Sequence, residues 1–275
     1  MGIIKSILRS GLAGLDRVWP KESQEWMWKY LYHRSRGSGN GNPATNGEYR
    51  LIEKCLQSVK GEFIAFDVGA NVGDWSLFVG QKTPKAKIYA FEPSPYTSSK
   101  LKERIGQAML SDRVHVENVA LGGQSGRAQL YEVGKASGSN SLHRREGIKW
   151  DVQEQHQITI KTGDEMFRGL EVPNIHFVKI DVEGHETEVL MGFQETLKNQ
   201  RIGVIQFEYG GSWIDSKTSL KEVFSYLRGH GYSLGKVFPG EVRLLPEYTQ
   251  DLEDYVYANY IAFPRHKKAD EFVFL

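Results

Sequence analysis

Short apolar runs alternate with helical stripes along most of the chain. The stripe of apolar residues in 48–59 predicts a helix, and the run 63–68, which a glycine follows, predicts a buried strand. Further strands are predicted at 87–92, 113–118, 175–181, 202–208, 232–237 and 257–263, and further helices at 75–81, 100–110, 186–197 and 220–228. This alternation is typical of an α/β fold, with helices on both faces of a mostly parallel sheet of about seven strands.

A small insertion interrupts this pattern in the middle of the chain. Two probable strands, 128–133 and 157–161, flank the polar stretch 134–155, so we expect a hairpin-like β insertion. Loops held by a rigid sheet often carry recognition. Arg144 and Arg145 in this stretch either bind a phosphate or carboxylate of a substrate or belong to a solvated loop.

The first 47 residues lie outside the alternation and form a separate segment. The aromatic stretch 26–32 predicts a helix, either docked on the main domain or acting as a lid, and 36–43 predicts a flexible loop. We therefore divide the chain into an extension (1–47) and one domain (48–275). Near the start, the apolar face of residues 3–8 suggests either packing on the domain or weak peripheral membrane association.

Composition narrows the classes of function. Lys plus Arg total 35 and Asp plus Glu total 34, so a net charge of +1 gives no reason to expect nucleic acid as a partner. No run approaches the roughly 18 apolar residues of a membrane span. The single cysteine, Cys55, excludes an internal disulfide and fits a reducing compartment, so we expect a cytoplasmic protein. The oligomeric state stays open.

The turn after the first strand carries candidate chemistry. Gly69 permits a tight turn, Gly73 permits the next helix to pack close to the strand, and Glu92 ends the second strand, where a carboxylate can accept hydrogen bonds from a ribose. A dinucleotide needs further glycines where this chain has Asn71 and Asp74, and Asp74 would repel a pyrophosphate. S-adenosylmethionine (SAM) carries no phosphate, and Asp67 and Glu92 suit it better. A turn without a ligand is the remaining alternative.

Four motifs resemble one family of enzymes. They are D-V-G-A-N-V-G at 67–73, F-E-P at 91–93, N-V-A-L-G at 118–122 and K-I-D-V-E-G-H-E at 179–186, and they occur in the order typical of the FkbM-type SAM-dependent methyltransferases. The resemblance covers roughly 48–264. It implies a Rossmann-like, seven-stranded class I methyltransferase sheet of order 3-2-1-4-5-7-6, whose last strand is antiparallel.

The resemblance also implies roles for individual residues. Glu92, next to Pro93, is expected to hold the ribose of SAM, and Asp181 is expected to lie at the transferred methyl group. The residues expected to line the methionine end are Gly69, Ala70, Asn71 and Gly73, with Asp67 before them; Asn118 and Val119 are expected to border the adenine. Ser141, in the insertion, is a further candidate for cofactor contact.

Methyl transfer to an alcohol needs a general base, because the hydroxyl must lose its proton. The candidates, in order of preference, are Asp181, Glu183, His185 and Glu208. Asp181 and Glu208 end neighbouring strands, and paired carboxylates there can raise one pKa. Glu183 and Glu186 can alternatively stabilise a helix N-terminus. The four candidates can also be interpreted as a divalent metal site, although we expect none.

Three hypotheses follow. The first is a SAM-dependent O-methyltransferase acting on a hydroxyl of a small molecule or glycan, such as a sugar, glycolipid or polyketide-like acceptor. The second is a non-catalytic methyltransferase-like binding protein, and the third is a nicotinamide-dependent carbohydrate enzyme. Tyr209 and Trp213, after the fifth strand, either stack on a sugar ring or pack in the core.

Overall fold

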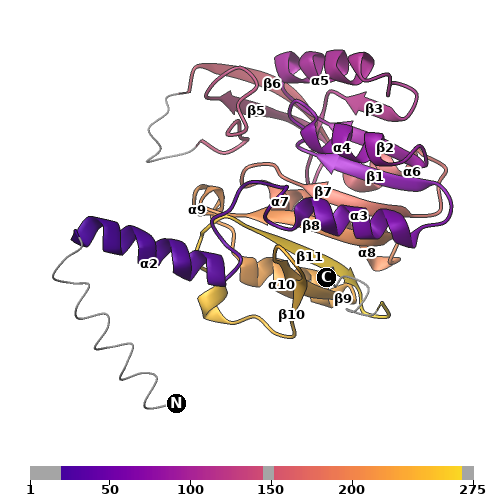
Figure 1. The fold of residues 1–275 in the computed structure, drawn as a ribbon. Helices are drawn as coiled ribbons and strands as arrows, with labels where there is room; N and C mark the ends of the chain where they lie inside the picture. The colour runs from indigo at the N-terminus through magenta and orange to yellow at the C-terminus, as the bar shows by residue number, and fades with distance from the viewer. Residues whose placement is uncertain (1–19, 145–151, 268–275) are drawn as a thin grey trace.

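The computed structural model describes residues 20–144 and 152–267 (Figure 1). Its main sheet has eight strands in the order β10-β9-β11-β8-β7-β1-β2-β3. The strands are β1 (Phe63–Val68), β2 (Ala86–Phe91), β3 (Val114–Glu117), β7 (Ile175–Ile180), β8 (Ile202–Tyr209), β9 (Tyr232–Val237), β10 (Val242–Leu245) and β11 (Ala258–Pro264). β11 runs antiparallel to both β8 and β9. The predicted class I methyltransferase order is confirmed, with the unpredicted edge strand β10 added.

Each face of the sheet packs against its own helices. Phe63 and Ala65 of β1 belong to the core beneath α3 (Glu48–Ser58), α4 (Asp74–Lys82) and α5 (Pro95–Gln107). Ile64 and Phe66 belong to the core on the opposite face. The helices of that face are α6 (Gly163–Arg168), α7 (Glu186–Met191), α8 (Gln194–Lys198) and α10 (Leu220–Gly229). The strand alternation of side chains therefore builds two cores.

The predicted helix at 186–197 is two helices. α7 ends at Met191 and α8 begins at Gln194. Between them, Gly192 lies so close to the small sheet that an added Cβ would be 2.2 Å from the Gly122 carbonyl oxygen. This contact needs a glycine, and periodicity alone could not reveal the break. Three short helices were also unpredicted: α6, α9 (Ser212–Ser216) and the 3-10 helix η1 (Gln250–Leu252).

The insertion forms a second, three-stranded sheet. β5 (Gly126–Glu132) pairs antiparallel with β6 (Glu154–Lys161), as predicted, and β4 (Ala120–Leu121) pairs parallel with β6. Arg144 is exposed, and Arg145 lies outside the described residues.

Helix α2 (Lys21–Ser35) confirms the predicted helix in the extension, but its predicted docking on the domain is wrong. None of its residues is buried, Trp26 is 68% exposed, and the helix projects from the body (Figure 1). The loop after it is tied to the sheet by hydrogen bonds from Lys236 to Ser38 and from Gly39 to Tyr257. The domain boundary at residue 47 stays a prediction.

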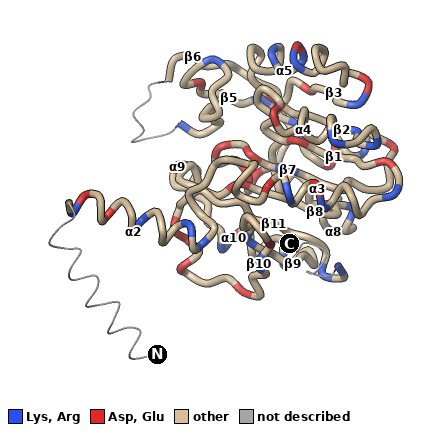
Figure 2. The backbone as a smooth tube through the Cα atoms, in the orientation of Figure 1, with Lys and Arg blue, Asp and Glu red and all other residues tan. Residues whose placement is uncertain are grey.

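The charged residues of the described chain form a mixed pattern, with acidic and basic groups interspersed along it (Figure 2). Among the described helices, none has the length and apolar character needed to cross a membrane. The apolar face predicted at residues 3–8 lies outside the described residues.

Candidate functional site

The turn between β1 and α4 brings two strands into very close contact. Gly69 has φ +82°, and an added Cβ would be 1.8 Å from the Asp181 carbonyl oxygen. Only glycine satisfies both conditions. Gly73 also has a positive φ, but its close neighbour is Leu101 of α5, not the strand as predicted. The turn therefore brings the end of β1 against the end of β7.

Glu92 follows β2 and faces this turn. One carboxylate oxygen accepts a hydrogen bond from the Asn71 N–H (2.9 Å), and the other accepts one from the Ser94 N–H (2.9 Å). Burial raises the pKa of Glu92 to about 7, although both N–H groups act in the opposite direction. The backbone therefore fixes the carboxylate and leaves further lone pairs on both oxygens.

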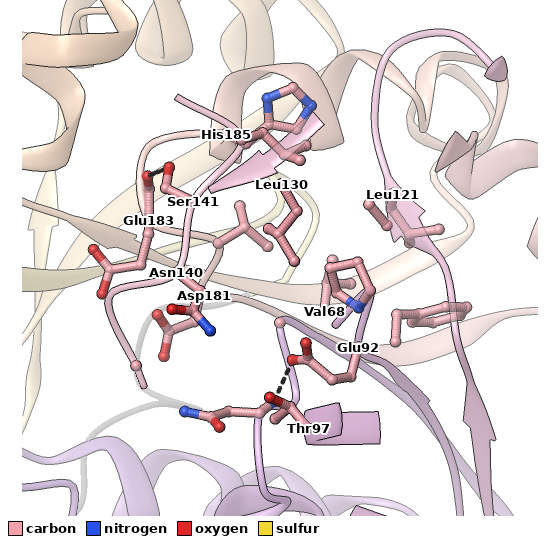
Figure 3. A pocket seen from close by; sticks show the side chains of 18 of the residues that line it. Val68, Glu92, Thr97, Leu121, Leu130, Asn140, Ser141, Asp181, Glu183 and His185 are labelled. Atoms are coloured by element: carbon pink, nitrogen blue, oxygen red, sulfur yellow. Dashed lines mark hydrogen bonds between the residues drawn. The ribbon is translucent and has the colours of Figure 1, made fainter. Parts of the chain in front are cut away.

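A pocket with an empty volume of about 710 Å³ opens at Glu92, and we call it the Glu92 pocket. Its walls combine apolar and polar groups. They include Phe91, Pro93, Thr97, Leu121, Leu130 and Leu142, together with Gly69, Asn71, Asn140, Ser141, Asp181, Glu183 and His185. Figure 3 shows Glu92 on one side of the pocket and Asp181 and Glu183 on the other. The mixture suits a ligand with a flat apolar part and a few polar groups.

The insertion closes the Glu92 pocket from the side. The Ser141 hydroxyl donates to the Glu183 carbonyl oxygen (2.7 Å), and His143 Nε2 lies 3.2 Å from His185 Nδ1. Burial, and then His143, lower the pKa of His185 to about 4. His185 is therefore neutral near pH 7 and one of its nitrogens faces another imidazole, so it is a weak candidate for the general base.

A second pocket adjoins the first, and we call it the Glu208 pocket. Its volume is about 980 Å³. The two pockets share the wall residues Gly69, Asn71, Gly138, Asp181 and Glu183. The Glu208 pocket is further lined by Glu48, Tyr49, Asp67, Ala70, Lys179, Glu208 and Tyr257. Carboxylates of helix α3, of strands β1 and β8 and of the loop after β7 thus meet in one cavity.

Three of the four predicted catalytic candidates converge in this second pocket. One carboxylate oxygen from each of Asp181, Glu183 and Glu208 lies within 4.8 Å of the others, a spacing that also suits a metal ion. Burial, followed by the charges of Asp181 and Glu183, raises the pKa of Glu208 well above its ordinary value. A carboxylate in this state is a stronger base than an exposed one.

Lys179 is the cation of this cluster. Its side chain is 7% exposed, and Nζ lies 2.8 Å from Asp181 Oδ2. Burial by itself lowers the pKa of Lys179, but the carboxylates of Asp181, Asp67 and Glu48 outweigh it and raise this pKa well above its ordinary value. Lys179 thus supplies one positive charge beside Asp181.

Several predicted residues have a position that differs from the expected one. Asn118 and Val119 line neither pocket, and the Asn118 amide instead donates to the carbonyl oxygens of Glu92 (2.8 Å) and Pro93 (3.0 Å). Their contact with adenine stays a prediction, as do the other assigned roles. Tyr209 and Trp213 are fully buried, so their stacking on a sugar ring is wrong and core packing is correct.

Glu186, the first residue of α7, has a structural role at the N-terminal end of this helix. Its carboxylate accepts hydrogen bonds from the backbone N–H groups of Val182 (3.0 Å) and Gly184 (3.0 Å). These bonds hold the loop that carries Glu183, whose φ of 54° lies in the left-handed region. Burial raises the pKa of Glu186 to about 8. Glu186 therefore shapes the site without facing either pocket.

Residues absent from the prediction also line the pockets. Lys179 lies two positions before Asp181 on one strand, so strand alternation placed both on the same face, and this signal was available. Glu48 begins α3, and its carboxylate accepts a hydrogen bond from Gln206 Nε2 (2.5 Å). No pattern in the chain connects Glu48 to β8.

Several known proteins similar to this chain are named as methyltransferases. The hexuronic acid methyltransferase AglP of Haloferax volcanii is 28% identical over 213 residues, which are 76% of this chain and 77% of AglP. The 31-O-demethyl-FK506 methyltransferase FkbM of Streptomyces tacrolimicus is 26% identical, over 62% of this chain and 73% of that protein. A solved structure of the N-terminal domain of human METTL16, in complex with S-adenosylhomocysteine (SAH), is also similar. Its sequence is 13% identical to this chain and the TM-score is 0.46; the match covers 83% of this chain and 72% of that one.

A family model described as the methyltransferase FkbM domain matches residues 67–234, which is more than half of the chain. The match begins at the glycine turn and includes Glu92, the insertion and the strand-end carboxylates. It confirms the resemblance drawn from the four motifs. The chain belongs to the FkbM methyltransferase family.

Proposed function

We propose that this protein is a SAM-dependent O-methyltransferase that methylates a hydroxyl of a sugar or other small molecule. The observation that carries the proposal is the meeting of two pockets at the carboxyl edge of one sheet. One contains a carboxylate fixed for a ribose, the other contains a cluster of carboxylates, and Asp181 and Glu183 line both. A donor and an acceptor bound in these pockets would be adjacent.

The polar groups of the Glu92 pocket, together with Asp67 of the adjoining Glu208 pocket, fit SAM. Both Glu92 oxygens keep lone pairs for the two ribose hydroxyls. Within the described residues, the buried oxygens Asp67 Oδ1 and Asn71 Oδ1 have no hydrogen-bond partner. Such acceptors suit the ammonium group of the methionine end, because a buried acceptor without a donor is costly. Leu121 and Leu130 offer an apolar wall for the adenine.

Bound SAM would supply an electrophilic methyl group on a sulfonium. The chain's own task is to align the acceptor oxygen behind that methyl and to accept the hydroxyl proton. We assign the proton to the Glu208 carboxylate, because its pKa is raised and its neighbours Asp181 and Glu183 favour protonation. Lys179 keeps Asp181 in an ion pair, so Asp181 is less suited to that step.

The relatives support an oxygen acceptor. One is named for hexuronic acid and one for a 31-O-demethyl compound, and the 2-O-methyltransferase NoeI of Sinorhizobium fredii is 27% identical over 56% of this chain and 65% of NoeI. These names support transfer to hydroxyl groups of sugars or polyketide-like molecules. The acceptor of this chain belongs to one of these classes.

Calorimetric titration of the full chain with S-adenosylhomocysteine (SAH) and, separately, with NAD tests the cofactor. We expect saturable binding of SAH alone, and binding of NAD alone would overturn the proposal. Incubation with methyl-labelled SAM and a panel of sugars, uronic acids and hydroxylated lactones then tests the reaction. SAH binding without label transfer to any hydroxyl class would favour the non-catalytic alternative.

A further inference from the structure

The small sheet contains a cluster of metal-binding side chains outside both pockets. It consists of Glu132 on β5 with Glu154 and His156 on β6, and one ligand atom of each lies within 4.8 Å of the others. His156 Nε2 is 3.4 Å from Glu132 Oε2 and 3.2 Å from Glu154 Oε2. One imidazole nitrogen thus faces two carboxylates.

Strand register explains why these residues meet. β5 and β6 are antiparallel, and Glu132 pairs directly with Glu154. His156 follows Glu154 by two positions, so both side chains lie on the same face of β6. Leu130, which lines the Glu92 pocket, pairs with His156. The pairing of β5 with β6 therefore fixes the cluster next to Leu130, in the wall of the Glu92 pocket.

Glu132 is the member that most needs a partner. Its side chain is 3% exposed, and within the described residues its buried Oε1 has no hydrogen-bond partner. The described chain also provides no lysine or arginine in an ion pair with Glu132 or Glu154. A buried carboxylate without compensation is costly, so a further positive group is expected at this point.

A divalent ion fits the observed spacing. Zinc binds imidazole nitrogen and carboxylate oxygen at roughly 2.0–2.2 Å, which separates two ligand atoms of a tetrahedron by about 3.4 Å. The separations of 3.2 and 3.4 Å between His156 Nε2 and the two carboxylate oxygens match this edge. An imidazole ligand favours zinc over magnesium or calcium, which prefer oxygen alone.

We propose that Glu132, Glu154 and His156 bind a divalent cation of the zinc class. His156 is 33% exposed and Glu154 is 51% exposed, so solvent completes the coordination. The ion joins β5 to β6 beside Leu130 and stiffens the wall of the Glu92 pocket. This role is structural and independent of the proposed methyl transfer.

Zinc binding to the full, untagged chain tests the site. The chain is first treated with a chelator and then titrated with zinc in competition with a fluorescent indicator. We expect one zinc per chain, with affinity at least about tenfold weaker in His156→Ala, which removes the imidazole ligand. The matched control His266→Ala removes an exposed histidine on β11's C-terminal side and should bind zinc as the unmodified chain does.

A second variant and two competitor ions make the test decisive. Glu132→Gln keeps the shape of the buried side chain and should also weaken zinc binding; circular dichroism checks that it folds. Magnesium and calcium should not displace the zinc. The proposal fails if His156→Ala binds zinc as tightly as the unmodified chain, or if saturable zinc binding is absent. Zinc binding lost only in Glu208→Gln would place the ion at the strand-end carboxylates and also overturn it.

Discussion

The Glu92 and Glu208 pockets hold their carboxylates in opposite ways. In the first, backbone N–H groups of Asn71 and Ser94 fix both oxygens of one carboxylate. In the second, Glu208 faces the like charges of Asp181 and Glu183, and Lys179 is the neighbouring cation. Burial raises the pKa of both Glu92 and Glu208. The N–H groups of the turn counteract this rise at Glu92 and fix its geometry, whereas the neighbouring carboxylates add to the rise at Glu208.

This difference suits the two carboxylates to different proposed tasks: Glu92 to binding the hydroxyl groups of a ligand and Glu208 to accepting a proton. A carboxylate fixed by the backbone suits a ligand whose hydroxyl groups must always meet it in the same place. A carboxylate whose pKa is raised suits a proton that must be taken up and released. Although the two pockets share a wall, Glu92 lines only the first and Glu208 only the second. Substituting either residue should therefore leave the function of the other pocket intact, and this can be tested.

The largest expected effect is on stability, through Lys179. Lys179→Met removes the cation that compensates the buried carboxylates of Asp67 and Glu48 as well as the partly exposed Asp181, so the free energy of unfolding should fall by about 3–5 kcal/mol at pH 7. Urea denaturation measures it. The control Lys82→Met removes a surface pair with Glu53 and should cost less than about 1 kcal/mol. Equal losses would show that Lys179 is not needed to compensate the cluster.

The next effect is on turnover, through Glu208. Glu208→Gln removes the proposed proton acceptor and should lower kcat about 100-fold. The affinity for SAH should stay within about twofold, because Glu208 does not line the Glu92 pocket. Steady-state kinetics and calorimetry measure the two quantities. A fully active Glu208→Gln would remove Glu208 from its role.

Glu92 should show the reverse pattern. Glu92→Ala removes the proposed ribose acceptor, so SAH affinity should fall by more than about tenfold. Glu103→Ala, a change at an exposed position of α5, is the matched control and should have no effect. Calorimetry on both variants measures the difference. Unchanged affinity in Glu92→Ala would mean that the ribose lies elsewhere.

The pH dependence of cofactor binding should sharpen the same assignment. The pKa of Glu92 is raised to about 7, so the free protein carries this group protonated below that pH and ionised above it. A protonated carboxyl is a poorer acceptor for two hydroxyls, so SAH affinity should fall by up to about tenfold from pH 8 to pH 6. Glu92→Gln should bind more weakly but without this pH dependence. The same slope in Glu92→Gln would assign it to another group.

The smallest effect is expected at His185. Its pKa of about 4 leaves it neutral near pH 7, and His143 occupies one nitrogen. His185→Asn should therefore change kcat by less than about threefold. A 100-fold loss, with Glu208→Gln active, would reverse the roles of the two residues. Steady-state kinetics at pH 7 checks this outcome.

The strands and the position of the site were predictable because both depend on local pattern, whereas the strand order was predicted from the family resemblance. Apolar runs and helical stripes identified seven of the eight strands in the main sheet, and glycine at position 69 marked the turn. Parallel strands deliver their carboxyl ends to one edge, so Glu92, Asp181 and Glu208 were expected near one another. The edge strand β10, a short segment with two exposed residues, carried no comparable signal.

Other predictions failed because burial depends on distant partners. The aromatic stretch in α2 has the composition of a packed helix, yet none of the residues of α2 is buried. Tyr209 and Trp213 are residue types that often stack on sugars, yet both are fully buried and pack against each other, with ring centroids 5.1 Å apart. Asn118 ends a strand at the expected place, but its amide bonds the backbone of Glu92 and Pro93 instead of facing the pocket.

The sequence by itself determined the family, the alternation of elements and which residues reach the carboxyl edge of the sheet, because these follow from periodicity and short motifs. Only the tertiary structure decided which groups share a cavity. Glu48 meets Lys179 and Glu208 across more than 100 positions of chain, and Glu132 meets His156 through strand register. Electrostatic interactions depend on distance and burial, and both are set by packing rather than by position along the chain.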